Sequence, residues 1–371
     1  MFDFLFLASY FIGILFTSFF ILNGIRQIAI TFNLYSKKKD RDIHITPTPK
    51  ILGAGFFILI VLGTFFYSNL FIEYIQYNIM IVSLLILTLI GIRDDLKIIR
   101  SVEKLFFQII AISIMLYFNP HLLVDNLYGF LGIYTIPIEI SFLFTLFIGI
   151  AMINSYNLID GIDGNAAITG IISFICFGIL FWITENQPFF GLSLLLTGIL
   201  IVYLPINLSK HKKGFMGDTG SMLIGFILFT LTLVFINDES MYLNVVLPSR
   251  SVNILAPLSI FSVPIIDTVS IYIYRIRIGK SIFAPDNFHI HHMAIRFFSN
   301  SHLVSSLFLG LIGLIIVVTM SYIVLIATAF MSILTYFIII SLAILVSFRY
   351  RQKLRIRLGN RKGNVEIITV N

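Results

Sequence analysis

Long apolar stretches constrain this chain more than any other feature, because they recur along all of its 371 residues. A helix needs about 20 residues to cross the hydrocarbon core of a membrane. Hydrophobic residues make up 58% of the chain and charged residues 12%, with a mean hydropathy of +1.00, which fits no soluble domain. The sequence therefore predicts an all-α, polytopic membrane helix bundle with about eleven transmembrane helices, roughly over residues 4–25, 51–67, 76–92, 105–118, 140–153, 166–184, 189–206, 220–236, 252–274, 303–324 and 326–348.

The basic residues indicate the orientation independently, because Lys and Arg collect in cytoplasmic loops. With an odd number of spans and the C-terminus inside, the N-terminus lies outside. Of the 25 Lys and Arg, only Arg250 then falls in an outer loop. We expect one integral membrane domain over residues 1–371, with a basic cytoplasmic tail over 349–371 that lies on lipid headgroups. The net charge of +7 reflects this topology, and no nucleic acid is needed to explain it.

Two further features limit what kind of chain this is. The first apolar run follows Asp3 instead of a basic segment and has no evident cleavage signal, so we expect no signal peptide. The single cysteine, Cys176, excludes an intrachain disulfide and a cysteine metal cluster.

The segment Asn154 to Gly164 interrupts two long apolar runs with polar groups. If the helix continues through it, Asn154, Asn157 and Asp160 share one face, and its glycines permit close approach of backbone or ligand. Polar residues in such a place are functional candidates, for an anion, a metal or a nucleotide. The alternative is a helix-ending turn, since Asn, Asp and Gly are turn residues.

Two adjacent acids, Asp94 and Asp95, stand at the end of an apolar run. They repel one another, so a cationic group must offset them. Either the nearby Arg93, Lys97 and Arg100 or a divalent metal would serve.

The inner loop from Asn207 to Gly217 leads into Phe215-Met-Gly-Asp218-Thr-Gly-Ser221. Asp218 and its neighbours are good helix-start residues, so capping is one interpretation. Free amides at a helix N-terminus also suit phosphate, and the Phe215 ring is suited to stack on a base. We favour a functional site.

An intramembrane acid and three histidines follow. Asp267 lies inside the ninth apolar run and is a functional candidate, although pairing with Arg275 or Arg277 is an alternative. His289, His291 and His292 fall within four residues. No second His or Cys cluster completes a transition-metal site, and imidazoles also donate to phosphate oxygens.

Two other loops carry weaker signals. In the first inner loop, Lys37 to Lys39 reflect topology, whereas His44, Thr46, Thr48 and Lys50 are as compatible with function as with topology. The outer loop from Asn119 to Glu139 alternates turn residues with β-prone pieces, which allows a small hairpin.

These polar groups, found separately along the chain, all fall on the cytoplasmic face of the predicted topology. Acids, amides, glycine turns and histidines at one membrane surface suit a metal-bound diphosphate with a lipid co-substrate. The carboxylates would hold the cation, and the basic groups the anion.

Four motifs together resemble one family. They are Asp-Asp at 94, Asn-x-x-Asn-x-x-Asp-Gly-x-Asp-Gly from 154, Phe-Met-Gly-Asp-x-Gly-Ser from 215 and Pro-Asp-x-x-His-x-His-His from 285. They look like the signatures of the polyprenyl-phosphate N-acetylhexosamine-1-phosphate transferases, the MraY/WecA superfamily (glycosyltransferase family 4). The order of the motifs and the span layout match over nearly the whole chain, and the His-x-His-His form is similar to the WecA branch.

The resemblance implies transfer of a sugar 1-phosphate from a UDP-N-acetylhexosamine, UDP-GlcNAc above all, to undecaprenyl phosphate, with Mg²⁺ or Mn²⁺ as cofactor. The products would be a lipid-linked pyrophosphoryl sugar and UMP, as in the first step of O-antigen, capsule or a related surface glycan. It also implies a bacterial inner (plasma) membrane, an active site on the cytoplasmic face and, by analogy, a homodimer.

The same resemblance assigns roles to residues. Asp218 and Asn157 would bind the metal, and Asp94 and Asp95, with Asp218, form the catalytic set by holding or deprotonating the lipid phosphate or assisting the metal. The remaining candidates are nucleotide-binding Asn154, Asp160, Asp163 and Phe215, and phosphate-binding His289, His291 and His292.

Three other functions are compatible with parts of the pattern. The peptidoglycan branch would use a UDP-muramyl-pentapeptide donor. An intramembrane prenyltransferase would need an Asp-x-x-x-Asp motif, whereas residues 94–98 read Asp-Asp-Leu-Lys-Ile. A transporter would need a midplane site and repeat symmetry; only Asp267 approaches such a site, and we detect no repeat.

Overall fold

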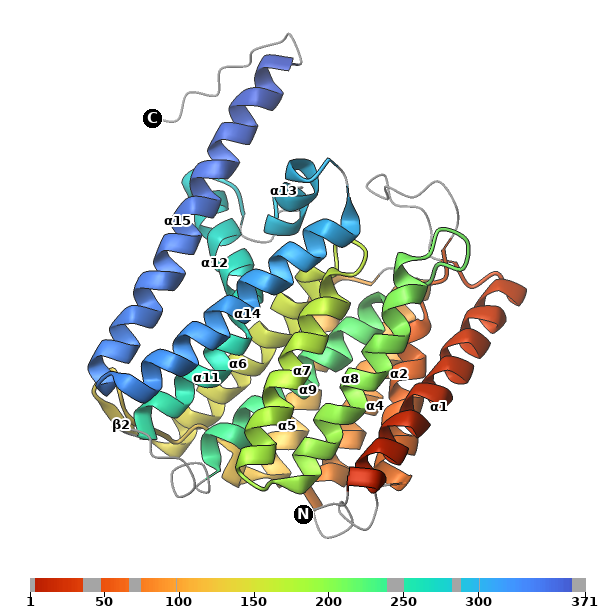
Figure 1. Cartoon of the computed structure of the whole chain (residues 1–371), viewed down its shortest axis with the longest axis horizontal. Coiled ribbons are helices and arrows are strands. Elements are labelled where there is room, and N and C mark those ends of the chain that lie inside the picture. Colours follow the sequence, from red (N-terminus) through yellow and green to blue (C-terminus); the bar gives the residue numbers. More distant parts are fainter. Residues whose placement is uncertain are drawn as a thin grey trace.

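The computed structural model describes residues 4–35, 48–66, 75–97, 99–238, 250–281, 288–299 and 301–361. This part of the chain is a bundle of helices with one small hairpin (Figure 1). The helices are α1 (Phe4–Thr31), α2 (Leu52–Phe66), α4 (Ile75–Leu96), α5 (Ser101–Phe118), η1 (Pro120–Leu122), α6 (Ile138–Ile159), α7 (Asn165–Ile183), α8 (Gln187–Leu208), α9 (Gly217–Asn237), η2 (Arg250–Ile254), α11 (Leu255–Ile260), α12 (Ser262–Arg277), α13 (Ile290–Phe297), α14 (His302–Ile326) and α15 (Ala329–Arg361). The strands are β1 (Asn126–Phe130) and β2 (Ile133–Thr135).

The lengths and composition of these helices confirm a polytopic helical membrane protein. In the described residues, eight helices are long and apolar enough to cross a membrane, or nine if a bent pair counts as one span. Helix α2 is a shorter apolar helix over Leu52–Phe65.

The ninth predicted span differs from the expected continuous helix over 252–274. The chain bends by 74° between the segments Arg250–Ile260 and Ser262–Arg277. Pro264 supplies a physical reason, because its ring nitrogen has no hydrogen to donate to the carbonyl of Ile260 one turn back. The second arm, α12, carries Asp267.

Helix α9 is the centre of the bundle. Its span is buried along its whole length, whereas the spans of α1 and α15 are mostly exposed, as lipid-facing helices would be. It packs against α2, α4, α6 and α7. Glycines permit this close packing: a β-carbon at Gly53 would overlap the backbone of Gly220.

The hairpin predicted as an option in the loop from Asn119 to Glu139 is present. Strands β1 and β2 pair antiparallel, and the Arg250 guanidinium lies 4.0 Å from the centre of the Tyr128 ring. In Figure 1 this hairpin lies at the end of the bundle opposite to α13. Helix α1 begins at the hairpin end and α15 ends at the other.

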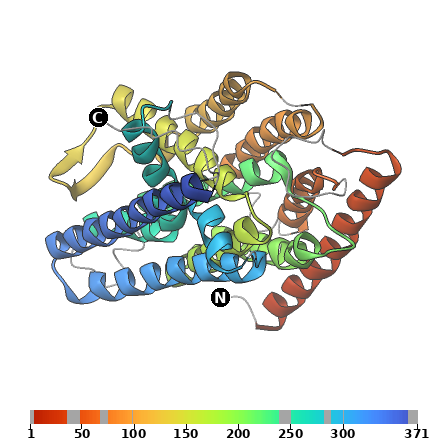
Figure 2. The ribbon, with the colours of Figure 1, turned by 90° about the horizontal axis from the view of Figure 1, so that it is seen from above.

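The C-terminal helix is longer than the predicted span, and one residue of the predicted basic tail is buried in the bundle; residues 362–371 lie outside the described residues, so a tail on lipid headgroups stays a prediction for them. Helix α15 continues past the predicted end at 348 to Arg361, and Arg351 is fully buried. It is buried because its side chain pairs with groups of the bundle, described below. Figure 2 shows α14 and α15 together on one side of the molecule and α1 on the other.

Lys37 to Lys39, His44 and Thr46, and the Pro285-Asp286 start of the histidine motif, lie outside the described residues.

Candidate active site

The site is built around the start of α9. Gly217 takes a left-handed conformation with a φ of 68°, which glycine adopts readily. Asp95 of α4 accepts hydrogen bonds from the amides of Asp218 at 2.7 Å and Thr219 at 3.1 Å, and from the Thr219 hydroxyl at 2.6 Å. A carboxylate here also complements the positive end of the helix dipole. Asp95 is buried and caps the start of α9. The Asp218 side chain takes no part in this cap and contacts Lys104 and Asn157 instead.

A lysine joins the acids of two helices. Lys104 Nζ of α5 lies 3.2 Å from Asp218 Oδ2 and 3.5 Å from Asp94 Oδ2. This ammonium offsets the charge of Asp94, one of the two adjacent acids. Arg93, an expected partner, pairs instead with Glu103 at 2.7 Å. The sequence did not single out Lys104, although its place next to the acids, at the start of the following predicted span, was visible.

The amide of Asn157 brings α6 to the same point. Helix α6 carries Asn154 and Asn157 and ends at Ile159, so the helix-ending turn considered as the alternative begins at Asp160. Asn157 Nδ2 donates to Asp218 Oδ1 at 2.6 Å and to Ser221 Oγ at 2.7 Å. Rotation of this amide by 180° would present its oxygen to a cation. Asn154 differs: its Nδ2 donates to Gln108 Oε1 of α5 at 2.9 Å.

The turn after α6 carries two more acids. Burial, together with the negative charges of Asp218 and Asp163, raises the pKa of Asp160 to about 7, while Lys50 opposes the rise. Asp163 Oδ2 lies 2.5 Å from Lys213 Nζ and 3.2 Å from His302 Nδ1. Sequence reasoning identified neither of these two partners.

The segment that enters α9 is tied to the first inner loop. The Phe215 amide donates to the carbonyl of Pro49 at 2.8 Å, and the Leu52 amide donates to the carbonyl of Phe215 at 3.3 Å. The Lys213 ammonium lies 5.3 Å from the centre of the Phe215 ring. Lys50, left open between function and topology, therefore lies beside the site.

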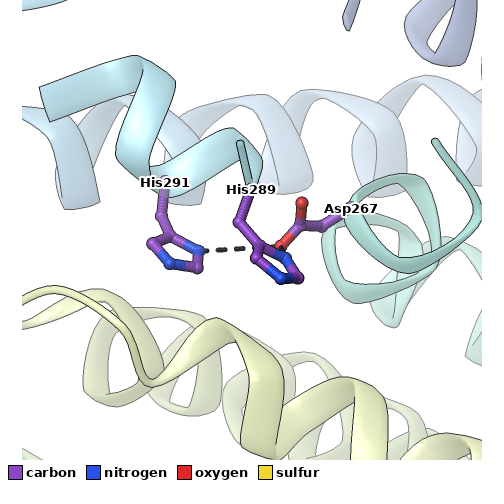
Figure 3. Close-up of side chains that lie close together, drawn as sticks. All are labelled: Asp267, His289 and His291. Atoms are coloured by element: carbon purple, nitrogen blue, oxygen red, sulfur yellow. Dashed lines mark hydrogen bonds and ion pairs between the residues drawn. The ribbon is translucent and has the colours of Figure 1, made fainter. Parts of the chain in front are cut away.

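The histidines form a second group around Asp267. His289 Nδ1 lies 3.0 Å from Asp267 Oδ2, and His289 Nε2 lies 3.4 Å from Arg275 Nη2. Figure 3 shows Asp267 of α12 facing the His289 and His291 rings. Asp267 pairs with His289 and with Arg351, at 3.5 Å, and not with Arg275 or Arg277 as the structural alternative expected.

His291 connects the two groups. Its Nε2 lies so close to Gly161 that any β-carbon there would overlap it. Gly161 lies in the turn that follows α6, four residues after Asn157. Burial lowers the pKa of His291, and burial with neighbouring His291 and His289 lowers the pKa of His292 to about 3. Both rings are therefore neutral at pH 7 in the protein alone.

The donor set at α9 fits a hard divalent cation. Asp218, Asp94 and the Asn157 amide supply oxygens, the ligands that Mg²⁺ prefers, and the Lys104 ammonium already lies between two of these carboxylates. Among the described residues, Asp267, His289 and His291 also place three ligand atoms within 4.8 Å of one another. Arg275 and Arg351 lie directly beside that second set, and their charge opposes a cation.

The fold and the site define a class: a polytopic membrane protein with carboxylates, amides and basic side chains gathered at one end of its helices. The family model of glycosyl transferase family 4 matches residues 77–236. The chain is 30% identical over 312 residues, 82% of this chain and 81% of the relative, to the probable undecaprenyl-phosphate N-acetylglucosaminyl 1-phosphate transferase of Bacillus subtilis.

Two further relatives have similar names. The undecaprenyl-phosphate alpha-N-acetylglucosaminyl 1-phosphate transferase of Salmonella typhimurium is 29% identical over 76% of this chain and 74% of its own length. The decaprenyl-phosphate N-acetylglucosaminephosphotransferase of Mycobacterium tuberculosis is 28% identical over 75% of this chain and 73% of its own length. The chain belongs to glycosyl transferase family 4, which confirms the resemblance carried by the four motifs.

Proposed function

We propose that this chain transfers N-acetylglucosamine 1-phosphate from UDP-GlcNAc to undecaprenyl phosphate. An oxygen of the lipid phosphate forms a bond to the sugar-bearing phosphorus of the donor, and the bond from that phosphorus to UMP breaks. The products are undecaprenyl-pyrophosphoryl-GlcNAc and UMP, which would begin a surface polysaccharide. The names of the relatives support the substrates. The observation that carries the proposal is the contact of Asp218 with Asn157 and Lys104, from three helices.

The chemical problem is to bring anions together. The lipid phosphate is largely dianionic at neutral pH, because its second pKa is about 6. It therefore needs little activation as a nucleophile. Asp218 and Asn157, assisted by Asp94, would hold Mg²⁺ or Mn²⁺, which neutralises charge on the diphosphate.

The chain's own side chains supply the other roles. Lys104 lies between Asp94 and Asp218 and is placed to receive a phosphate when a metal takes over the carboxylates. Asp94 would hold the lipid phosphate or accept its remaining proton. Asp95 was grouped with Asp94 from the sequence; its hydrogen bonds to α9 favour the role of fixing the start of that helix.

The donor would extend from this point along the turn after α6. Uridine would meet Asn154, Asp160, Asp163 and Phe215, with Lys213 and His302 holding the Asp163 carboxylate. The phosphates would meet His291 and His292. Both ring nitrogens of His289 already contact Asp267 and Arg275, which favours a supporting role for that residue.

The membrane arrangement belongs to the same proposal. One domain over residues 1–371 would cross a bacterial inner membrane with about eleven spans, with the N-terminus outside and the site on the cytoplasmic face. The start of α1 and the end of α15 lie at opposite ends of the bundle (Figure 1), which supports an odd number of crossings. Lys104 and Lys213 at the site end of the bundle support the cytoplasmic face. A homodimer is proposed by analogy alone.

The direct test is donor screening with purified protein, undecaprenyl phosphate and radiolabelled UDP-GlcNAc. We expect labelled lipid and an equal amount of UMP, both lost with a chelator and restored by Mg²⁺. Label transfer from UDP-MurNAc-pentapeptide but not from UDP-GlcNAc would overturn the donor and place the chain in the peptidoglycan branch. Prenyl transfer without any nucleotide would overturn the reaction.

A further inference from the structure

A buried ion pair lies behind residues 288–292, which we call the histidine loop. Asp267 of α12 and Arg351 of α15 approach to 3.5 Å, with side chains 2% and 0% exposed. A charged pair at this depth costs free energy unless further hydrogen bonds satisfy both groups. Hydrogen bonds of both members of this pair go to the histidine loop.

Each member of the pair holds the loop at different atoms. Asp267 Oδ1 accepts a hydrogen bond from the Ile290 amide at 2.8 Å, and Asp267 Oδ2 contacts His289 Nδ1 at 3.0 Å. Arg351 Nε donates to the carbonyl of Phe288 at 2.7 Å. Three consecutive residues are thus fixed by two helices, and Asp267 provides the cap at the start of α13.

The fixed loop determines where His291 lies. His291 Nδ1 is 3.6 Å from Asp267 Oδ2, and its Nε2 faces Gly161 in the turn after α6. That turn follows Asn157, which binds Asp218. A shift of the loop therefore changes the distance between the imidazole and the α9 end of the site.

A metal is the competing use of these ligand atoms. Asp267, His289 and His291 have the spacing for one. Yet the Arg351 guanidinium lies 3.5 Å from the carboxylate, and Arg275 Nη2 lies 3.4 Å from His289 Nε2. A divalent ion would be buried next to two fixed cations, in a site where repulsion between charges is poorly screened. The charges favour orientation of the imidazoles over metal binding.

We propose that Asp267 and Arg351 are positioning residues for the transfer reaction, and that the C-terminal helix thereby takes part in building the active site. The proposal rests on the proposed function. When a phosphate dianion approaches His291, the Asp267 carboxylate behind the ring stabilises the protonated imidazole that donates through Nε2. Without Arg351, the Phe288 carbonyl loses its donor and the loop shifts.

The test uses full-length Arg351→Met, Asp267→Asn and the double variant, with Arg349→Met as the matched control. Arg349 lies two residues earlier on the same helix and is exposed. We expect kcat to fall about 100-fold in each single variant, the scale of a misplacement near 1 Å, while KM for UDP-GlcNAc changes less than about 3-fold. The double variant is expected to match the worse single variant, because both residues act through one loop. The control is expected to stay within about 2-fold of the wild type.

A conservative variant separates positioning from folding. Lysine at 351 keeps the charge but cannot reproduce the planar fork of arginine, so Arg351→Lys is expected to recover part of the lost kcat. If Arg351→Met does not purify as a monodisperse protein, the kcat values of Arg351→Lys and Asp267→Asn test the proposal, because both substitutions keep the side chain close to its original size.

Three results would overturn the proposal. The first is a wild-type kcat in Asp267→Asn, or a wild-type kcat in both Arg351→Lys and Arg351→Met. The second is a loss carried entirely by KM. The third is one equivalent of zinc in the purified wild type that Asp267→Asn removes. If the wild type releases no UMP from UDP-GlcNAc, the proposed function itself is contradicted, independently of the activities of the variants.

Discussion

Two acidic sites lie at the same end of the bundle, one at the start of α9 and one around Asp267 of α12. They differ in exposure and in the partners of their carboxylates. At the start of α9, Asp218 is 33% exposed and shares Lys104 with Asp94. Around α12, Asp267 is 2% exposed and meets His289, the Ile290 amide and Arg351. The Asp218 carboxylate thus retains an exposed side, whereas the Asp267 carboxylate is enclosed by its partners.

The difference separates binding from positioning. A ligand site needs acids that can exchange a lysine for a metal, and hard oxygen donors suit Mg²⁺. A positioning site needs an acid whose partners are all supplied by the protein, since an incompletely paired buried charge is costly. Residue type alone does not distinguish the two, because both groups are aspartates beside basic side chains.

The largest effect is expected from Asp218→Asn, which removes the charge at the centre of the first group. UMP release should fall about 1,000-fold or more, since charge stabilisation of the diphosphate depends on it. Asp238→Asn, at the other end of α9 and bonded to Asn186, is the matched control and should retain activity. Radiolabelled UMP release from monodisperse protein measures both. Full activity in Asp218→Asn would remove this residue from the metal role.

A smaller loss is expected from Lys104→Met, which leaves Asp94 and Asp218 without their shared cation. We expect kcat to fall about 100-fold through lost phosphate stabilisation. Glu103→Gln, the neighbouring residue whose partner is Arg93 on the surface, is the control. Equal activity of the two variants would show that Lys104 only offsets charge in the ligand-free protein.

The contact between the two groups can be tested at Gly161. A methyl group in Gly161→Ala would overlap His291 Nε2 and displace the ring. We expect a loss of about 10-fold in kcat, less than removal of a catalytic charge. Gly24→Ala in α1 meets nothing within 4 Å and should leave kcat unchanged. A wild-type kcat in Gly161→Ala would separate His291 from the reaction.

The smallest effect on chemistry is expected at Gly53, where α2 meets the start of α9. Its replacement by alanine would press a β-carbon against the Gly220 backbone, at a cost of about 1–3 kcal/mol in unfolding free energy. Thermal unfolding in detergent, with Gly24→Ala alongside, measures the change. An unaltered transition in Gly53→Ala would show that this helix contact is looser than described.

The sequence predicted the class and much of the site because both have local signals. Apolar runs have the length of membrane spans. Polar interruptions predicted Asn157 and Asp218 on the same face of the membrane, and the family resemblance paired the two residues. The basic partners had no such signal. Lys104, Lys213 and Arg351 stand at span ends, where topology alone already accounts for lysine and arginine.

The bent span and the buried pair were missed for a related reason. Pro264 was visible, but a proline in a membrane helix does not fix the size or direction of a bend. Arg351 was assigned to a lipid-facing tail because nothing near it in sequence shows that Asp267 and Phe288 lie beside it. Such tertiary pairs depend on how the helices pack.

The most direct measurement is Mn²⁺ binding, followed by electron paramagnetic resonance in the presence of UDP-GlcNAc. The account predicts one bound Mn²⁺ in the wild type, its loss in Asp218→Asn and its retention in Asp267→Asn. Retention in Asp218→Asn with loss in Asp267→Asn would place the metal among the histidines and contradict the account.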